Sequence, residues 1–252
     1  MCGRFTLKTP VANWLSSLFP DWQTQSPTPW LALPDGLRQP RYNIAPTQQI
    51  AVVRMGGDGA TELSSMRWGL VPSWADSLSV SYINARSETL ADKPSFRSLL
   101  RNKRCVVLGD GYYEWKKLST KAKEPYWIHS PDEHVFAMAG LWTENRKIPI
   151  EGSEARSIVS ATIITTESNR DVSEVHDRMP AILWSSEQIA AWLAPSKADA
   201  SDDERLLNLL VPSPLDCLRL RVVTPQVNNA RNEGAHLLYG LEDGSMHSPD
   251  GL

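Results

Sequence analysis

The sequence predicts an α+β fold: one domain with a mostly antiparallel, barrel-like β core flanked by helices. Three observations predict it. The chain has 252 residues, which suits one domain better than two. Hydrophobic residues make up 41% of it, enough for a sizeable core. Segments with strand character outnumber those with helical character. We expect the domain to span residues 1–240, with a frayed tail at 241–252.

The predicted helices share amphipathic spacing or a capping residue at their start. They cover residues 9–19, 94–103, 185–193 and 202–210. Thr9 before Pro10 suits the N-cap and first position of a helix, and Ser185 opens a capping box. Residues 20–40 contain five prolines and few periodic apolar positions, so we expect an irregular surface loop there.

The predicted strands share runs of β-branched, aromatic or aliphatic residues bounded by turn formers. They cover residues 50–55, 66–74, 104–108, 111–116, 126–129, 134–142, 157–166 and 217–223. A Ser-Pro-Asp turn lies between the segments at 126–129 and 134–142, and it predicts that these two strands form a hairpin. Gly109 and Asp110 interrupt the apolar run between two other strands.

Charge and cysteine content exclude several classes of protein. The net charge of −3 argues against a broad phosphate-binding surface, although a local arginine-lined groove is compatible with it. No run of 18 apolar residues occurs, so we expect no membrane span, and no secretory signal opens the chain. The three cysteines are widely spaced and fit neither a disulfide framework nor a zinc site. We therefore expect a cytoplasmic protein without metal or other cofactor.

Cys2 is a candidate nucleophile if Met1 is removed, which its small side chain permits. The mature residue would carry an α-amine and a thiol. At pH 7 the neutral fraction of an α-amine is about 300 times that of a lysine amine, because its pKa is much lower. Such an amine forms a Schiff base with an aldehyde, and the adjacent thiol can close a five-membered thiazolidine. Most Met-Cys starts have no such role, so Cys2 alone decides nothing.

Three further positions have side chains suited to chemistry. Asn84 offers a donor and an acceptor, but it also suits a turn. Glu114 shares a strand face with Tyr112, and a carboxylate among aromatic rings can have a raised pKa; an exposed strand glutamate is an equal alternative. His176 lies in a Val-His-Asp-Arg-Met-Pro segment that suits a loop holding a proton shuttle. Arg86 offers a fork for phosphate, or is a surface arginine.

Nine short segments together resemble the SRAP (SOS response-associated peptidase) family, and they follow in the family's order over nearly the whole chain. They are Met1-Cys-Gly-Arg-Phe, Tyr42-Asn-Ile-Ala-Pro, Trp68-Gly-Leu-Val-Pro-Ser-Trp, Ile83-Asn-Ala-Arg-Ser-Glu-Thr, Phe96-Arg, Arg104-Cys, Gly111-Tyr-Tyr-Glu-Trp-Lys, Ile163-Ile-Thr-Thr and Val175-His-Asp-Arg-Met-Pro. Each segment is weak alone, but their joint order is specific.

The resemblance implies a protein that senses abasic sites in single-stranded DNA and cross-links to them. Cys2 would react with the ring-opened aldehyde of the lesion, and the resulting thiazolidine would shield it. Asn84 would orient the N-terminus and the sugar, while Glu114 and His176 would handle protons. The family name also carries a peptidase activity, thought to remove the protein's own initiator residue or propeptide.

The resemblance also assigns DNA contacts. Arg4, Arg86 and Arg178 would contact phosphates, and Pro46, Trp74 and Thr165 would line the DNA channel. In some relatives a second tryptophan follows the one that matches Trp74 and helps wedge bases apart. Ala75 stands there in this chain, so the second stacking platform is missing. Substituting tryptophan at this position is expected to leave single-strand cross-linking intact and, if anything, to improve activity at duplex junctions. The resemblance implies a monomer that acts at damaged DNA of the nucleoid.

Two other functions compete with this one. A cysteine peptidase acting on other peptides would use Cys2 as nucleophile, but it gives no reason for the arginine and tryptophan candidates. A non-catalytic single-strand binding module would usually carry more positive charge than this chain. The joint presence of Cys2, Asn84, Glu114 and His176 also argues against a simple binding module.

Overall fold

The structure is a computed structural model that describes residues 2–9, 18–20, 35–57, 59–149, 157–196 and 199–240. Most of the helix predicted at 9–19 and most of the proline-rich segment lie outside these ranges, as does the C-terminal tail. The described part of the proline-rich segment contains a short helix, α3 (Asp35–Arg38). In the part of the chain that is described, no helix is long and apolar enough to cross a membrane.

The larger sheet closes on itself. Its five long strands are β3 (Gln49–Met55), β4 (Thr61–Trp68), β6 (Arg104–Gly109), β9 (Phe136–Asn145) and β10 (Ile158–Glu167). They run in the order β10-β4-β3-β6-β9, and β9 pairs again with β10 to complete a ring. The short strands β5 (Asn84–Arg86), β11 (Arg178–Pro180) and β12 (Ile182–Leu183) add to it. β4 and β5 run parallel to β10, and the other described pairings are antiparallel. The predicted sheet-rich α+β class is confirmed.

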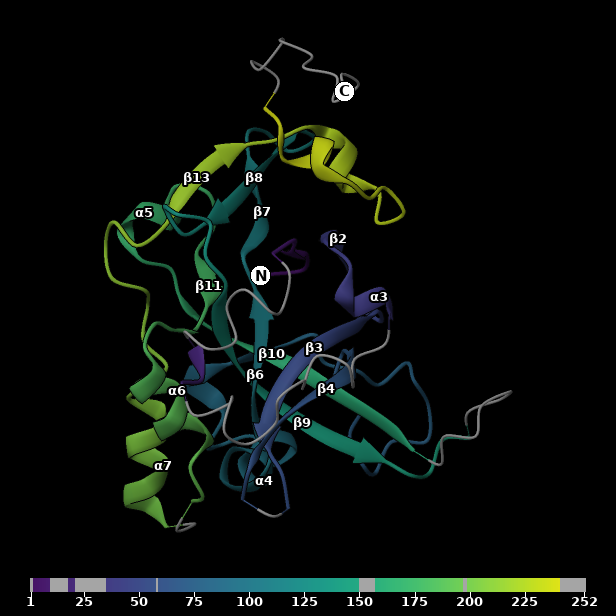
Figure 1. Cartoon of the computed structure of the whole chain (residues 1–252), viewed down its shortest axis with the longest axis vertical. Helices are drawn as coiled ribbons and strands as arrows, with labels where there is room; N and C mark the ends of the chain where they lie inside the picture. The colour runs from purple at the N-terminus through teal and green to yellow at the C-terminus, as the bar shows by residue number, and fades with distance from the viewer. Residues whose placement is uncertain are drawn as a thin grey trace.

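A second sheet stands against one end of the ring, in the upper half of Figure 1. Its order is β13 (Arg219–Val222), β8 (Lys123–His129), β7 (Gly111–Lys117), β1 (Phe5–Leu7) and β2 (Arg41–Ile44). Phe5 of this sheet and Trp68 of the ring meet edge to face, with ring centroids 5.1 Å apart. Both side chains are fully buried, so this contact lies in the core between the two sheets.

The predicted hairpin between residues 126–129 and 134–142 is wrong. β8 pairs with β7 and β13, whereas β9 belongs to the ring. The segment 130–135 therefore carries the chain from one sheet to the other instead of turning it back on its neighbour. The chain makes the opposite crossing at Asp110, the single residue between β6 and β7.

Helices cover the outside of the ring. α4 (Pro94–Asn102), α5 (Arg170–Ser173), α6 (Ser186–Leu193) and α7 (Ala200–Leu207) are the α-helices that follow β5. The capping box at Ser185 is confirmed: its hydroxyl accepts from the Gln188 N–H at 3.2 Å, and the Gln188 side chain accepts from the Ser185 N–H at 3.3 Å. Trp192 of α6 donates from Nε1 to the Cys105 carbonyl at 2.8 Å, which ties this helix to β6.

Candidate functional site

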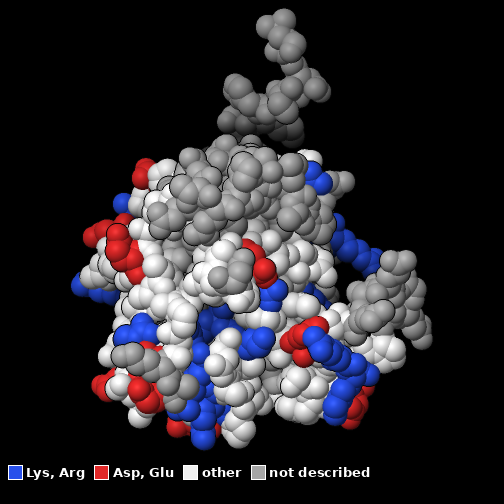
Figure 2. Space-filling view, turned by 60° about the horizontal axis from the view of Figure 1, so that its bottom comes forward, with Lys and Arg blue, Asp and Glu red and all other residues white. Residues whose placement is uncertain are grey.

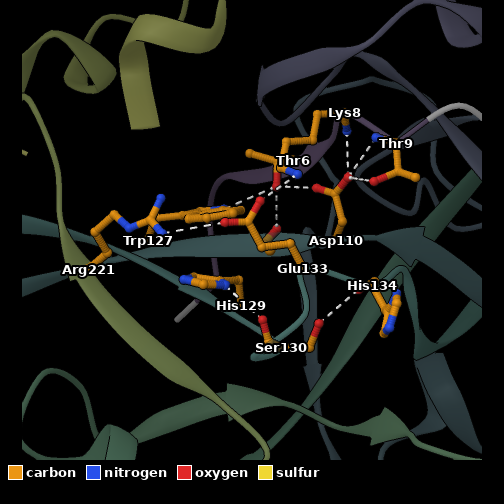
Figure 3. Close-up of polar contacts among 11 residues, drawn as sticks. Thr6, Lys8, Thr9, Asp110, Trp127, His129, Ser130, Glu133, His134 and Arg221 are labelled. Atoms are coloured by element: carbon orange, nitrogen blue, oxygen red, sulfur yellow. Dashed lines mark hydrogen bonds and ion pairs between the residues drawn. The ribbon is translucent and has the colours of Figure 1, made fainter. Parts of the chain in front are cut away.

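A buried carboxylate fixes the segment that follows β1, as Figure 3 shows. Asp110 is fully buried and accepts four hydrogen bonds: from the Thr6 hydroxyl at 2.6 Å, the Lys8 N–H at 2.7 Å, the Thr9 N–H at 2.8 Å and the Thr9 hydroxyl at 3.0 Å. Because Asp110 directly precedes β7, it ties the end of β1 to the start of β7. The sequence showed Asp110 only as a break between strands, and its place between two glycines was the available signal.

Charged groups around Trp127 strengthen this attachment. Glu133 lies 2.8 Å from Lys8 Nζ and 3.4 Å from Arg221 Nη2, and both cations lie within 6 Å of the Trp127 ring centroid. His129 stacks on the same indole at 4.0 Å. Burial first, then the charge of Arg221, lowers the pKa of His129, so its ring is neutral near pH 7. This cluster holds Lys8, the residue that follows β1.

The register of β1 places Cys2 beside β7. Phe5 lies opposite Tyr112, and the Tyr113 N–H donates to the Arg4 carbonyl at 2.9 Å. Continuing this antiparallel register brings the residues before Phe5 toward Glu114. The Cys2 side chain is fully buried, with Sγ 3.9 Å from the Arg4 carbonyl oxygen. Burial first, then the negative charge of Glu114, raises the pKa of the Cys2 thiol. The resting thiol is therefore protonated at neutral pH.

Asn84 reaches Cys2 from the ring sheet. Parallel pairing of β5 with β10 sets Asn84 opposite Ile163, at the end of the ring that faces the second sheet. Asn84 Nδ2 donates to the Cys2 carbonyl oxygen at 2.7 Å. The other amide atom, Oδ1, is buried and has no hydrogen-bond partner among the described residues. One acceptor next to Cys2 is therefore left for a further donor.

Glu114 and His176 complete the group. Burial raises the pKa of the Glu114 carboxyl, and the positive charge that His176 can carry opposes the shift. His176 Nε2 lies 3.9 Å from Glu114 Oε2. Its other nitrogen, Nδ1, lies 2.8 Å from Asp177 Oδ1 and accepts the Arg178 N–H at 3.0 Å. With a proton on Nδ1 the ring would donate to Asp177 instead, so both protonation states have a partner.

The structure thus brings together the four catalytic candidates from four separate segments. The His176 side chain is 27% exposed, whereas that of Glu114 is 3% exposed. The histidine is therefore open to solvent, whereas the carboxyl group is enclosed by the protein. Among the described residues, no group of three or more His, Cys, Asp or Glu side chains is arranged to hold a metal ion.

Comparison with known proteins decides the family. Residues 1–230 match the family model described as SOS response associated peptidase (SRAP). The chain belongs to the SRAP family. It is 38% identical over 240 residues to the abasic site processing protein YoqW of Bacillus subtilis (strain 168), covering 94% of this chain and 99% of that one. It is 32% identical over 227 residues to the abasic site processing protein HMCES of Xenopus tropicalis, covering 77% of this chain and 64% of that one.

Solved structures show the same SRAP fold. A crystal structure of a protein from Bacteroides thetaiotaomicron superposes with a TM-score of 0.72 at 23% identity, over 95% of this chain and 99% of that one. A phage-related protein from Bordetella bronchiseptica gives a TM-score of 0.66 at 27% identity, over 88% of this chain and 94% of that one. The ring sheet and the second sheet together are therefore an architecture found in other proteins.

The three arginines that the SRAP resemblance assigns to phosphates differ in their surroundings. Arg4 is half-buried, and its Nη1 donates to Asn43 Oδ1 at 2.7 Å and to the Val227 carbonyl at 2.9 Å.

Arg178 is buried in a two-point ion pair with Glu88, at 2.7 and 3.0 Å, and also donates to the Thr165 carbonyl at 2.6 Å. Arg86 is exposed, and its guanidinium has no partner among the described residues. Arg86 is therefore the one of the three that is available to phosphate without rearrangement.

The residues that the SRAP resemblance assigns to the DNA channel also differ in their exposure. Trp74 is 53% exposed on the loop after β4 and can stack on a base, while Pro46 is half-buried. Thr165 is fully buried in β10, so only its backbone and the Arg178 beside it can influence a ligand. Ala75 is 1% exposed and packs with Val71 and Ile158. An indole at position 75 would have to displace these neighbours, so the burial of Ala75 argues against the expectation that the tryptophan substitution leaves cross-linking intact.

The charged surface of this SRAP chain is mixed. In the view of Figure 2, a group of basic side chains lies in the lower middle, with acidic side chains on both sides of it. Several arginines are already paired, such as Arg101 with Asp203 at 2.5 Å and Arg146 with Glu144 at 2.9 Å. This pairing agrees with the small net charge, and it favours a narrow contact with phosphates over a broad one.

Proposed function

We propose that this SRAP protein processes abasic sites in single-stranded DNA by attaching covalently to them through Cys2. The observation that carries the proposal is the 2.7 Å hydrogen bond from Asn84 to the Cys2 carbonyl, made within the same site as Glu114 and His176. It fixes the backbone of a residue whose α-amine would be the nucleophile. The names of the relatives, abasic site processing proteins, support the same conclusion.

The first step of the proposed reaction uses the α-amine of Cys2 after removal of Met1. The amine lone pair forms a C–N bond with the aldehyde carbon, and the carbonyl π electrons move to oxygen. Glu114, a buried carboxylate, accepts the proton that the nitrogen loses. His176 gives one proton to the oxygen to form the carbinolamine hydroxyl. The proton held by Glu114 then passes to this hydroxyl, which leaves as water as the nitrogen lone pair forms the iminium, and Glu114 is again a carboxylate. The greater exposure of the histidine suits it to exchange protons with solvent.

The second step closes the ring. The Cys2 thiol loses its proton, its sulfur bonds to the iminium carbon, and the C=N π electrons become the nitrogen lone pair. The product is a thiazolidine, which has no C=N bond for water to attack. Because burial keeps the resting thiol protonated, the first bond is made by the amine and the thiol only locks the adduct.

DNA would lie across the exposed groups beside the site. Arg86 follows Asn84 by two residues on β5, so a phosphate on its guanidinium would place the sugar close to Cys2. Trp74 is exposed and can stack on a base. Replacing such a stacking residue by alanine weakens the binding free energy by roughly 1–3 kcal/mol. We propose that these two side chains supply the contacts that do not depend on base identity.

The test is incubation with a single-stranded oligonucleotide carrying one abasic site, followed by a denaturing gel. Wild-type protein should give a heat-stable, shifted band. Cys2→Ser keeps the amine, so it should give a product that borohydride traps while the heat-stable band falls sharply. Intact DNA of the same sequence is the matched control. Absence of any shifted band with wild-type protein that lacks Met1 would overturn the proposal.

A cysteine peptidase remains the second candidate, because the family model is named for such an activity. The buried, protonated thiol argues against attack on added peptides. We propose that peptidase activity, if present, is limited to removal of Met1. Cleavage of added peptides by wild type, together with no borohydride-trapped DNA product from Cys2→Ser, would favour the peptidase.

A further inference from the structure

The hydroxyl of Tyr112 is buried and makes no hydrogen bond to the described residues in the resting structure. The whole Tyr112 side chain is fully buried in β7. A buried hydroxyl without a partner is costly, and in native proteins it calls for an explanation. The cost is confined to the oxygen atom, because the rest of the ring packs in the apolar core.

The position of Tyr112 links it to the reacting groups. It lies two residues before Glu114, so both side chains leave the same face of β7. It lies opposite Phe5 of β1, the strand that follows Cys2, and it belongs to the same buried cluster as Cys2. Tyr112 is thus on the Glu114 face of β7 and packs in the buried cluster that contains Cys2.

The neighbouring Tyr113 shows that this fold can satisfy a buried tyrosine. Tyr113 is equally buried but points to the other face of β7, and its hydroxyl donates to the Tyr42 carbonyl at 2.8 Å. Tyr113 belongs to a different buried cluster from Cys2. Two adjacent tyrosines of equal burial therefore differ in their hydrogen bonding: the hydroxyl of the tyrosine that shares a buried cluster with Cys2 is the one left unpaired among the described residues.

The phenol keeps its proton. Burial first, then the negative charges that Cys2 and Glu114 carry when ionised, raises the pKa of Tyr112 well above its ordinary value. At neutral pH the group is an O–H donor and not a phenolate. A neutral donor that interacts electrostatically with Cys2 is suited to stabilise negative charge that develops on sulfur.

We propose that the Tyr112 hydroxyl donates a hydrogen bond to the sulfur of Cys2 during ring closure. The inference rests on the proposed function and concerns its second step. The S–H proton passes to the Glu114 carboxylate, the sulfur electron pair forms the C–S bond to the iminium carbon, and the C=N π electrons become the nitrogen lone pair. Tyr112 loses no proton: its O–H stabilises the charge on sulfur while the bond forms.

This role predicts that activity and stability respond in opposite directions. Tyr112→Phe removes the hydroxyl but keeps the ring, so it removes an unpaired buried group. Its Tm should be unchanged or higher than that of wild type. Tyr113→Phe removes a satisfied hydroxyl and leaves the Tyr42 carbonyl without its donor, so its Tm should fall. Tyr113→Phe is therefore the matched control.

The experiment is single-turnover cross-linking at saturating single-stranded DNA with one abasic site, using full-length protein without Met1. Formation of heat-stable adduct and formation of borohydride-trapped product are followed in parallel for wild type, Tyr112→Phe and Tyr113→Phe. For Tyr112→Phe we expect heat-stable adduct to form about tenfold to a hundredfold more slowly. Its borohydride-trapped product should appear at the wild-type rate, and Tyr113→Phe should match wild type in both rates.

Three results would overturn the inference. The first is a wild-type rate of heat-stable adduct for Tyr112→Phe. The second is equal slowing of the two products, which would place the hydroxyl at the amine step. The third is a fall in Tm as large as that of Tyr113→Phe, which would mean that the hydroxyl already has a structural partner. If wild type itself forms no adduct, the proposed function fails, and that outcome is distinct from these three.

Discussion

Asn84 on β5 of the ring sheet donates a 2.7 Å hydrogen bond to the carbonyl of Cys2, which precedes β1 of the second sheet. The two sheets thus meet at the residue whose amine is proposed to react. The same residue is held on its other side by the register of β1 with β7. The N-terminal segment is therefore positioned by both sheets, which suits a nucleophile at the free end of a chain.

The hydrogen bond can be tested by Asn84→Asp, which keeps the size of the side chain but replaces the donor by a carboxylate. Repulsion between this carboxylate and the Cys2 carbonyl should misplace the amine, and cross-linking should slow by about 10²-fold. Binding of single-stranded DNA without a lesion should change much less. Asn102→Asp makes the same change on an exposed residue of α4 and should have no effect. Equal rates for Asn84→Asp and wild type would contradict the positioning role.

Burial of Glu114 predicts a dependence of stability on pH. The pKa of the Glu114 carboxyl is raised in the folded protein by burial. At a pH where the carboxyl is ionised, the buried charge therefore lowers the free energy of unfolding. The penalty is absent below the ordinary glutamate pKa, grows as the pH rises from that value to the raised one, and is constant above it. Glu114→Gln should therefore raise Tm at pH 7, and its advantage should shrink as the pH falls toward about 4. Thermal melts at several pH values measure this. An advantage that grows toward acid pH would have the wrong sign.

Arg86 and Arg178 should respond differently to replacement. Arg86 is exposed and has no side-chain partner among the described residues, so Arg86→Ala should weaken binding of all single strands alike and lower the salt slope by about 0.7. Arg178→Ala breaks the buried pair with Glu88, so it should lower Tm and change the slope less. Fluorescence anisotropy over a range of salt concentrations, with a melt of each variant, separates the two effects. If Arg178→Ala reduces the slope equally at an unchanged Tm, its guanidinium contacts phosphate and leaves Glu88.

Asp110 should contribute strongly to stability. Asp110→Ala removes the acceptor of four hydrogen bonds and should lower the free energy of unfolding by about 2–4 kcal/mol. Asp110→Asn should cost less, because the Thr6 hydroxyl can turn its proton to the Gly111 carbonyl 3.2 Å away. Asp76→Asn, at a side chain that is 87% exposed, should change the free energy by less than about 0.5 kcal/mol. Urea unfolding of the three variants gives the order; equal effects of Asp110→Ala and Asp76→Asn would contradict this role.

The sequence predicted where strands and helices lie better than it predicted how they pair. β-branched runs such as Ile158–Glu167 form strands whichever neighbour they find, so the strand at 157–166 is confirmed. The hairpin between 126–129 and 134–142 failed because alternation along a strand is the same in either sheet. The single-residue crossing at Asp110 sends β7 into a different sheet from β6, and no local pattern shows this.

The residues of the candidate site could also be predicted from the sequence better than their contacts could. Residue chemistry and the family resemblance singled out Cys2, Asn84, Glu114 and His176, and the fold brings them together. Partners far apart in the chain were invisible in the sequence: Arg178 pairs with Glu88 across 90 positions. The burial of Ala75 and the different states of the two adjacent tyrosines likewise depend on packing between the sheets.

The most direct test of the account locates the bond between protein and DNA. The cross-linked product is digested with trypsin and nuclease, and the modified peptide is sequenced by mass spectrometry. The account predicts a peptide that begins at Cys2, lacks Met1 and carries the abasic sugar on its first residue, with a mass that corresponds to loss of one water. A heat-stable adduct on a lysine, or on protein that retains Met1, would contradict it.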